Sequence, residues 1–287
     1  MLKSILITGA SSGIGKATAI NLAKNNYKVF AGVRNDKDLK MLQTEKLDNL
    51  TPVILDVTKP DLIDAVHNQI VDFVGEQGLF ALINNAGVNY VMPFELCEER
   101  ELRKLMEVNV FGAIHLSQKF FSLLQKYKIS TGQNSHIINI GSIGSVVGLP
   151  WQYIYHVSKF AIYGFTKSLR IELDKLGIKA SCVLPGSVET PIFDKTASGI
   201  DSKFESLSSI NKGYYKKSLE NMSGLAVKFR AQALKPEKVG ELIYKMLEKQ
   251  NPKVKNVIGL DARLMNFMEL YLPSWLSIWI VKSLMVK

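Results

Sequence analysis

Residues 8–15 read TGASSGIG and lie between a short apolar run and an amphipathic stretch. The glycines Gly9, Gly13 and Gly15 let a backbone turn tightly and approach a pyrophosphate at the N-terminus of a helix. A glycine-rich loop alone is weak evidence, because glycines also serve ordinary turns. The position of this loop after a first strand and before a first helix predicts dinucleotide binding.

Outward from this loop, short β-rich runs alternate with helical patterns such as 60–77 and 95–127. Nearly continuous apolar runs are typical of strands buried on both faces of a parallel sheet. The sequence therefore predicts an α/β fold with helices on both sides of the sheet, and no linker divides the single domain expected over 1–287. The predicted strands are 4–8, 27–33, 51–57, 79–84, 135–141 and 179–184, with a weaker seventh at 256–260.

Composition narrows the class of protein. The 287 residues contain 47% hydrophobic and 22% charged residues, which are ordinary globular values. Two cysteines, Cys97 and Cys182, cannot form a disulfide framework, and no Cys/His spacing indicates a metal site. The apolar run at the N-terminus is shorter than a secretory signal needs, so we expect a first strand and a cytoplasmic protein.

The formal net charge is +10, and most of the basic residues are lysines. Lysine is a solvated point charge, whereas nucleic-acid readers rely on arginine forks and on recognisable motifs. We therefore expect no nucleic-acid partner. Attraction to an anionic membrane surface stays open.

The end of the second predicted strand bears on the choice of cofactor. An acidic residue there would bind the ribose 2′-OH of NAD, whereas an arginine accommodates the 2′-phosphate of NADP. This chain has no carboxylate at the strand end, and Arg34 follows immediately. NADP(H) is favoured, while nearby Asp36 keeps NAD(H) as the alternative.

One helical pattern, YIYHVSKFAIYGFTK at 153–167, contains two Tyr-x-x-x-Lys pairs. Each pair, Tyr155–Lys159 and Tyr163–Lys167, would share one face of a helix. A lysine ammonium near a phenol favours the phenolate, so either pair could transfer a proton. The local pattern does not choose between them.

Taken together, TGASSGIG, NNAG at 84–87, Ser142, Tyr155-x-x-x-Lys159 and PG at 185–186 resemble the short-chain dehydrogenase/reductase family. The resemblance implies a Rossmann-type doubly wound sheet and hydride transfer between a nicotinamide cofactor and an alcohol or carbonyl. A weaker similarity, based on VFAGVR, LTPVILDVT and an apolar C-terminal extension, points to the hydroxysteroid and retinol dehydrogenase branch. The family spacing from its serine favours the first Tyr/Lys pair over the second.

The resemblance implies roles for individual residues. Tyr155 would be the general acid/base, Ser142 would orient the substrate oxygen, and Asn109 would support a water relay to Lys159. Lys159 would also hold the nicotinamide ribose, and Ser145 and His156 are not expected to be catalytic. The implied cofactor contacts are Gly9, Ser11, Ser12, Gly13, Ile14, Gly15, Arg34, Asp56, Val57, Asn85, Ala86, Gly87, Tyr155, Lys159, Pro185, Gly186, Val188 and Thr190.

Two regions fall outside the alternation of strands and helices. Residues 187–230 form a Lys- and Ser-rich insertion after the sixth strand, where it would cover a site at the carboxyl ends of the strands. The region's apolar and aromatic residues predict a hydrophobic carbonyl or alcohol substrate.

The second region, the C-terminal extension 261–287, is too short in its charge-free run to span a bilayer. Pro273 predicts two short amphipathic helices. Their apolar faces would pack on the protein, lie in a homodimer or homotetramer, or touch a membrane, and the first two are favoured. An NAD-dependent alcohol dehydrogenase and a non-catalytic dinucleotide sensor stay as alternative functions.

Overall fold

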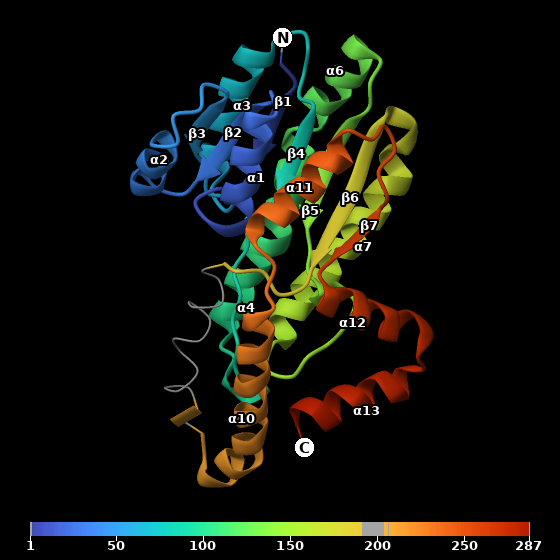
Figure 1. The fold of residues 1–287 in the computed structure, drawn as a ribbon. Helices are drawn as coiled ribbons and strands as arrows, with labels where there is room; N and C mark the ends of the chain where they lie inside the picture. Colours follow the sequence, from blue (N-terminus) through green and yellow to red (C-terminus); the bar gives the residue numbers. More distant parts are fainter. Residues whose placement is uncertain (1, 191–203, 206, 287) are drawn as a thin grey trace.

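The computed structural model describes residues 2–190, 204–205 and 207–286. Within these residues the centre of the protein is a parallel seven-stranded sheet in the order β3-β2-β1-β4-β5-β6-β7 (Figure 1). The predicted parallel α/β architecture and the weak seventh strand are therefore confirmed. The strands are β1 (Ser4–Ile7), β2 (Lys28–Val33), β3 (Leu50–Ile54), β4 (Ala81–Asn84), β5 (Ser135–Ile140), β6 (Ile178–Pro185) and β7 (Lys255–Ile258).

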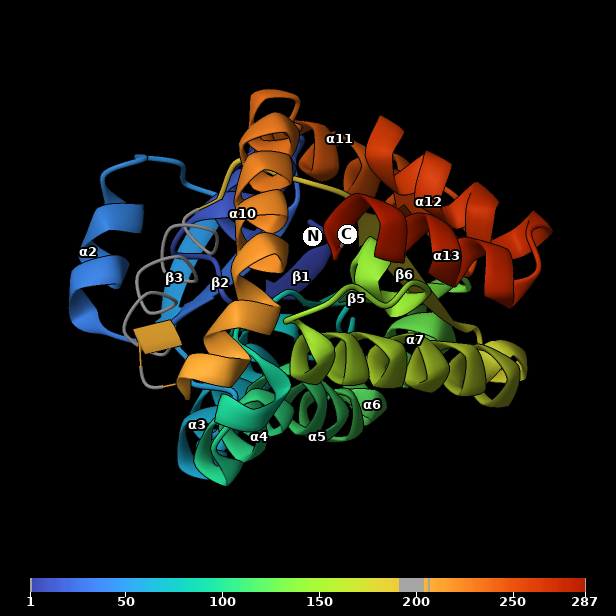
Figure 2. The same ribbon diagram turned by 90° about the horizontal axis from the view of Figure 1, so that it is seen from below.

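Helices cover both faces of the sheet because successive strand side chains point to opposite sides. In β1, Ile5 and Ile7 belong to one buried cluster and Leu6 to the other. The first cluster includes α1 (Gly13–Lys24), α2 (Asp36–Gln43) and α11 (Pro236–Leu247). The second includes α3 (Pro60–Val74), α5 (Gly112–Lys119), α6 (Phe121–Thr131) and α7 (Tyr153–Leu173), and Figure 2 shows these helices on the other side of the sheet from α11.

The order of the strands reverses between β1 and β4, which pair directly through Ile7 and Ile83. In an open parallel sheet, ligands bind at such a switch point, outside the carboxyl ends of the strands. The loop TGASSGIG leaves β1 at this edge, and the segment 85–87 leaves β4 beside it. The topology thus brings together two motifs that are far apart in the sequence.

The helix predicted over 95–127 is interrupted. A short turn, η1 (Phe94–Leu96), precedes α4 (Glu99–Met106), and a π-helical turn, η2 (Glu107–Phe111), precedes α5. Gly112 then lies so close to Val57, in the turn after β3, that a Cβ on it would stand 2.7 Å from the Val57 side chain. Hydrophobic periodicity predicts a helical region but not an inserted π turn, which depends on this packing.

Apart from α11, which packs against α1 on the sheet, the helices of the C-terminal third lie beyond the carboxyl ends of the strands (Figure 1). The part of the predicted insertion at 191–203 and 206 lies outside the described residues, and α10 (Ser209–Ala231) forms most of the rest. The tail folds as α12 (Leu260–Tyr271) and α13 (Ser274–Met285), with Pro273 as the N-cap of the second helix. The predicted pair of short helices is confirmed.

Candidate active site

The loop after β1 can be built only with glycine at its key positions. Gly9 and Gly13 have φ of +66° and +55°, a region that other residues rarely adopt. A Cβ on Gly13 would lie 2.8 Å from the Thr190 side chain, and one on Gly15 would lie 2.2 Å from the Gly9 carbonyl oxygen. The glycines therefore keep the backbone exposed at the start of α1.

The serines and isoleucine of this loop lie at the same helix N-terminus. Ser12 is the N-cap of α1, and its side chain makes no capping hydrogen bond. Ser11 and Ile14 are half-buried beside it. An exposed N-terminus with an unengaged hydroxyl fits a pyrophosphate, since both supply hydrogen-bond donors and α1 adds its dipole.

Thr8, which the list of predicted contacts omits, joins the two loops at the switch point. Its hydroxyl oxygen accepts hydrogen bonds from the backbone N–H groups of Asn85 and Ala86, each at 3.0 Å. The Asn85 amide donates in return to the carbonyl oxygens of Thr8 and Gly9, at 2.9 and 3.0 Å. The sequence signal for this role was the position of Thr8 at the end of the first strand, because a hydroxyl there can reach the loop that follows the adjacent strand.

The end of β2 presents an exposed cation. Arg34 is solvent-exposed and has no ion pair or hydrogen bond within the described part of the chain. The next residue, Asn35, caps α2 by accepting the Asp38 N–H at 2.9 Å, and Asp36 is exposed. Arg34 is therefore available to an anionic ligand.

The end of β3 carries another predicted contact. Asp56 accepts hydrogen bonds from the Thr58 N–H at 2.9 Å and the Thr58 hydroxyl at 2.8 Å. This is the turn-capping geometry that a strand-end aspartate commonly adopts. The side chain of the neighbouring residue, Val57, is buried and packs against Gly112, so it faces the interior of the protein.

Ser142 and Ser145 hold each other in a tight turn after β5. The Ser142 hydroxyl accepts the Gly144 N–H at 3.1 Å, and the Ser145 hydroxyl accepts the Ser142 N–H at 3.2 Å. Ser145 is buried, whereas Ser142 keeps exposed surface. The turn therefore presents Ser142, and Ser145 serves to hold it.

Helix α7 brings Tyr155 and Lys159 to the end of β5. The Lys159 Nζ donates to the Ile140 carbonyl oxygen at 2.8 Å and lies 5.6 Å from the centroid of the Tyr155 ring. Ser142 and Tyr155 are hydrogen-bond partners through their side chains. The three side chains thus meet at the carboxyl edge of the sheet.

Burial controls the protonation of this pair. Loss of water raises the pKa of Tyr155, and the hydrogen bond with Ser142 opposes that rise. Burial also lowers the pKa of Lys159 to about 8, against a smaller effect of Cys182. In the protein without cofactor, burial therefore penalises the charged form of each group, and it raises the pKa of the Tyr155 phenol.

The π turn η2 places Asn109 behind Lys159. The Asn109 amide oxygen accepts the Val88 N–H at 2.8 Å, and its Nδ2 donates to the Val88 carbonyl oxygen and the Ser158 hydroxyl. A Cβ on Gly87 would lie 3.4 Å from the Asn109 Oδ1 and 3.8 Å from the Lys159 Nζ. Glycine at 87 thus keeps open the space between these two polar groups.

The second Tyr/Lys pair has the same local geometry but different surroundings. The Lys167 Nζ lies 5.8 Å from the centroid of the Tyr163 ring. Tyr163 packs in a cluster with Cys182, and Lys167 is exposed. Among the described residues no strand-end serine accompanies this pair, so of the two pairs the first is the one that lies within the site.

His156 supports the loop that follows Ser142. Its Nδ1 donates to the Gly144 carbonyl oxygen and its Nε2 accepts the Leu149 N–H, both at 3.1 Å. The two bonds fix the tautomer, and burial lowers the pKa of the ring. Both nitrogens are occupied, which agrees with the prediction that His156 is not catalytic.

The predicted contacts after β6 lie in a loop that the tail holds in place. Pro185 ends the strand, Val188 is buried, and Thr190 packs on Gly13. The Asp261 carboxylate, at the start of α12, accepts the Ser187 N–H at 2.7 Å.

Gly186 lacks the side chain that would block this contact, since a Cβ there would stand 2.1 Å from the Asp261 Oδ1. Asp261 was missed from the sequence because its partner is 74 residues away.

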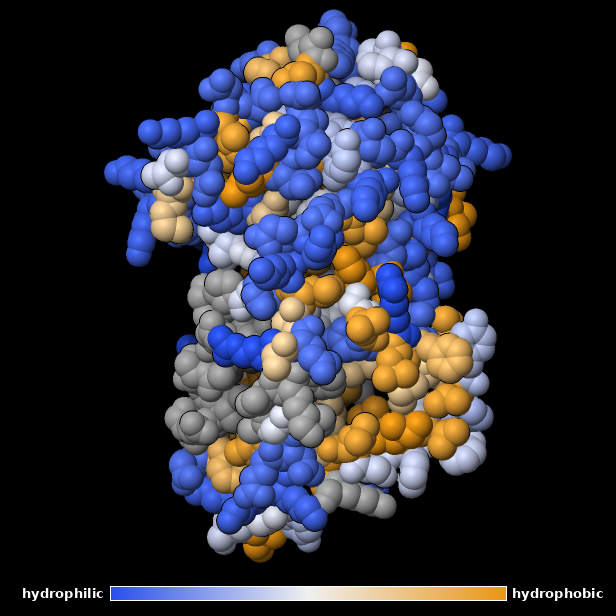
Figure 3. Space-filling model, viewed as in Figure 1, coloured by the Kyte–Doolittle hydropathy of each residue, from blue (hydrophilic) through white to orange (hydrophobic). Residues whose placement is uncertain are grey.

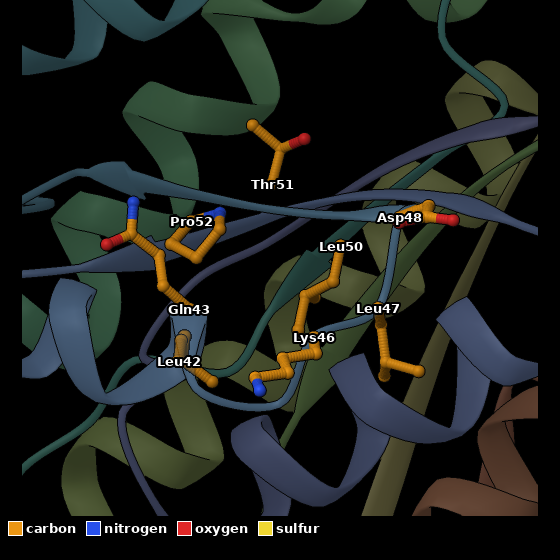
Figure 4. Close-up of a pocket in the computed structure, with 8 residues that line it drawn as sticks. All are labelled: Leu42, Gln43, Lys46, Leu47, Asp48, Leu50, Thr51 and Pro52. Atoms are coloured by element: carbon orange, nitrogen blue, oxygen red, sulfur yellow. The ribbon is translucent and has the colours of Figure 1, made fainter.

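Other features carry no comparable chemistry. The hollow in Figure 4, lined by residues of the 42–52 segment, lies at the amino end of β3, away from these side chains. Across the described ranges we find no group of three or more His, Cys, Asp or Glu side chains that could hold a metal ion.

Comparison with known proteins agrees with this geometry. A family model described as short chain dehydrogenase matches residues 3–201. Rat estradiol 17-beta-dehydrogenase 2 is 35% identical over 193 residues, which cover 66% of this chain and 49% of the rat protein. The chain therefore spans about half the length of that relative.

Two further proteins match over most of both chains. The 3-ketodihydrosphingosine reductase of Bacteroides thetaiotaomicron is 30% identical over 256 residues, covering 89% of this chain and 87% of the relative. A solved short-chain dehydrogenase from Streptomyces avermitilis superposes with a TM-score of 0.76 at 25% identity, covering 99% of this chain and 97% of that one. On the sheet order, the glycine-rich loop and these matches, the chain belongs to the short-chain dehydrogenase family of NAD(P)-dependent oxidoreductases.

Proposed function

We propose that the chain is an NADP(H)-preferring oxidoreductase acting on a hydrophobic ketone, aldehyde or secondary alcohol. The observation that carries the proposal is the meeting of Ser142, Tyr155 and Lys159 at the carboxyl edge of the sheet. This edge adjoins the glycine-rich loop, whose shape fits a dinucleotide pyrophosphate. These residues form one site, in which the glycine-rich loop binds the cofactor and Ser142, Tyr155 and Lys159 face the substrate.

Nicotinamide, when bound, supplies or accepts the hydride. On reduction, Tyr155 donates its phenolic proton to the substrate oxygen as the carbonyl carbon gains hydride. On oxidation, the Tyr155 phenolate takes that proton back from the alcohol. The Ser142 hydroxyl donates a hydrogen bond to the same oxygen and stabilises its developing charge.

Lys159 supports this proton transfer. Its lowered pKa, about 8, keeps the protonated and neutral forms within reach of neutral pH, so the amine can pass a proton toward the phenol. The open space at Gly87, between the Lys159 Nζ and the Asn109 Oδ1, suits a water that connects them to solvent. Lys159 also holds the ribose hydroxyls in this proposal.

Preference for NADP(H) rests on Arg34. The guanidinium is exposed, and it can pair with a 2′-phosphate without losing an existing partner in the described structure. Asp56, engaged by Thr58, is proposed as an adenine contact, and Thr190 as a carboxamide contact. NAD(H) is the alternative cofactor, since Asp36 is exposed two residues after Arg34.

A hydrophobic substrate agrees with the apolar side chains around this edge. Trp151 is buried in the loop after Ser142, and its indole N–H donates to the Ser218 hydroxyl of α10 at 3.1 Å. The Trp151 ring also packs edge-on against Tyr215. Aromatic side chains thus connect the loop to α10, as expected of a hydrophobic binding site. Two of the relatives are named as a steroid dehydrogenase and a keto-sphingoid reductase, which points to the same substrate class.

A single domain over 1–287, a cytoplasmic location and a homodimer or homotetramer stay predictions. The alternative of a non-catalytic dinucleotide sensor predicts cofactor binding without turnover. The intact Ser142, Tyr155 and Lys159 set favours the enzyme.

A substrate panel of ketones and alcohols, run with NADP(H) and NAD(H), tests the proposal through the absorbance of the reduced nicotinamide. Tyr155→Phe is expected to lower kcat by about 100-fold or more, because it removes the acid/base proton. Tyr163→Phe, the matched control, is expected to stay within about twofold of the unmodified chain, since Tyr163 packs away from the edge. Similar loss in both variants would contradict the assignment.

Arg34→Ala tests the cofactor preference. We expect KM for NADPH to rise by about tenfold with little change for NADH, because a phosphate–arginine pair contributes about 1.5–3 kcal/mol. Better turnover with NADH in the unmodified chain would overturn this part of the proposal. Cofactor binding without turnover of any substrate would favour the sensor.

A further inference from the structure

The two helices of the C-terminal extension expose large apolar side chains. We call these the α12–α13 surface, formed by Leu264, Phe267, Trp275, Ile278 and Trp279. Each of these residues is more than half exposed, from 55% for Phe267 and Trp279 to 69% for Trp275. Figure 3 shows apolar side chains gathered over this part of the molecule, whereas the part over the sheet is mostly hydrophilic. The extension therefore does not bury all of its apolar residues on its own protein.

Apart from Leu284, the exposed apolar residues of each helix follow one stripe. Along α13, Trp275, Ile278, Trp279 and Lys282 follow the spacing of a single helical stripe, and all four are exposed. On α12, Leu264 and other exposed apolar residues repeat in the same way. A helix that packs on a protein core turns such a stripe inward, so these helices are turned the opposite way.

The outward orientation is held by contacts on the inner side. Met285 is buried, and α13 contacts both α10 and α12. Asp261 anchors the start of α12 by accepting the Ser187 and Ala262 N–H groups at 2.7 and 2.8 Å. Self-packing thus covers the inner faces and leaves the stripe outside.

Length decides how such helices can meet a bilayer. Each has 12 residues, far fewer than the roughly 20 that span the hydrocarbon core. Among the described residues, no helix has both the length and the hydropathy of a membrane span. Short helices with one apolar face instead lie in the plane of the interface, with tryptophan and tyrosine at the headgroup level.

Charge distinguishes a lipid surface from a second copy of the chain. Each copy carries a formal charge of +10, so two copies repel one another while an anionic surface attracts them. Lys282 continues the apolar stripe of α13, where its long side chain can reach lipid phosphates. The net charge and the position of Lys282 both favour an anionic bilayer over a second copy of the chain.

We propose that the α12–α13 surface docks on an anionic lipid bilayer. Helix α12 begins directly after β7 and contacts the turn at 143–145 that follows Ser142. Docking would therefore bring the carboxyl edge of the sheet to the membrane, so that a lipid-dissolved molecule could enter from the bilayer. The inference stands apart from the proposed function, because a surface can bind lipid whether or not the site turns over.

Vesicle co-sedimentation of the full chain tests the proposal. Vesicles of phosphatidylcholine mixed with phosphatidylserine are expected to bind the chain, with at least about tenfold weaker binding to pure phosphatidylcholine and weakening by added salt. Ile278→Glu is expected to reduce binding by about tenfold or more, because it removes an apolar anchor that docking would bury and adds a negative charge that anionic lipid repels.

The control is Ile171→Glu, which alters an isoleucine of α7 that is 81% exposed outside the surface. We expect its vesicle binding to equal that of the unmodified chain, and the same of Tyr155→Phe. Equal losses in the Ile278 and Ile171 variants would overturn the proposal, as would equal binding to neutral and anionic vesicles. A chain that ignores vesicles but changes from dimer to monomer with Ile278→Glu in ultracentrifugation would assign the surface to a second copy instead.

Discussion

Replacing Lys159 with methionine is expected to stabilise the folded protein near neutral pH while abolishing turnover. The amine is 5% exposed, and burial lowers its pKa from the ordinary 10.5 to about 8. Such a fall corresponds to about 3 kcal/mol of destabilisation wherever both the folded and the unfolded chain carry the proton. Methionine has a similar length and carries no charge, so this penalty disappears in the variant.

A lost hydrogen bond offsets part of the gain. The Lys159 Nζ donates to the Ile140 carbonyl oxygen at 2.8 Å, and leaving that oxygen without this donor costs about 1–2 kcal/mol. At pH 7 the free energy of unfolding of Lys159→Met is therefore expected to be about 1–2 kcal/mol higher than that of the unmodified chain.

The pH dependence is the sharper signature. Between the folded pKa of about 8 and the unfolded value of 10.5, the unfolded chain binds more protons at Lys159, so raising the pH stabilises the unmodified protein. The unmodified chain should therefore gain about 2–3 kcal/mol relative to the variant between pH 7 and pH 10. The advantage of Lys159→Met disappears or reverses at the alkaline end.

Urea unfolding of both chains without cofactor, at several pH values between 7 and 10, measures this difference. Lys167→Met is the matched control, since its ammonium already lies in water at the same helical spacing from a tyrosine. Its free energy of unfolding is expected to stay within about 0.5 kcal/mol of that of the unmodified chain, because Lys167 lies on the surface. A difference between Lys159→Met and the unmodified chain that does not change with pH would refute the claim that a buried ammonium destabilises the site.

Three further substitutions, and Gly164→Ala as a control, test the scaffold. Gly15→Ala is expected to lower the free energy of unfolding in urea by about 1–3 kcal/mol, because its Cβ would clash with backbone atoms. The same variant should bind dinucleotide more weakly, as measured by fluorescence titration. Gly164→Ala, whose Cβ would lie in open space on α7, should instead raise the free energy of unfolding by about 0.5–1 kcal/mol. His156→Gln should cost about 1–3 kcal/mol at pH 7, and less at pH 5, where protonation of the unfolded histidine already weakens the unmodified chain. Asp261→Ala should lower stability by about 1.5–3 kcal/mol and raise KM for NADPH, since the loop at Ser187 loses its acceptor. Unchanged midpoints in these variants would contradict the contacts described.

Much of the fold follows from local pattern. Apolar runs of strand length alternate with helical periods, and this alone predicts seven parallel strands and a helix pair interrupted at Pro273. The glycine-rich loop is equally local, because its conformation depends on residues that lack a Cβ. The ends of elements and the π turn before Gly112 were not predictable, since they depend on partners that are distant in the sequence, such as Val57 in the turn after β3.

The sequence by itself determined that two Tyr/Lys pairs would share one helix face, and both pairs do so at nearly equal distances, 5.6 and 5.8 Å. Only the tertiary structure decided that they differ. The end of β5 buries Lys159 against a carbonyl oxygen beside Ser142, and solvent surrounds Lys167. The same distinction holds for the tail, where periodicity predicts amphipathic helices but not which face points outward. Helical spacing is a property of neighbours in the chain, whereas burial and charge depend on neighbours in space.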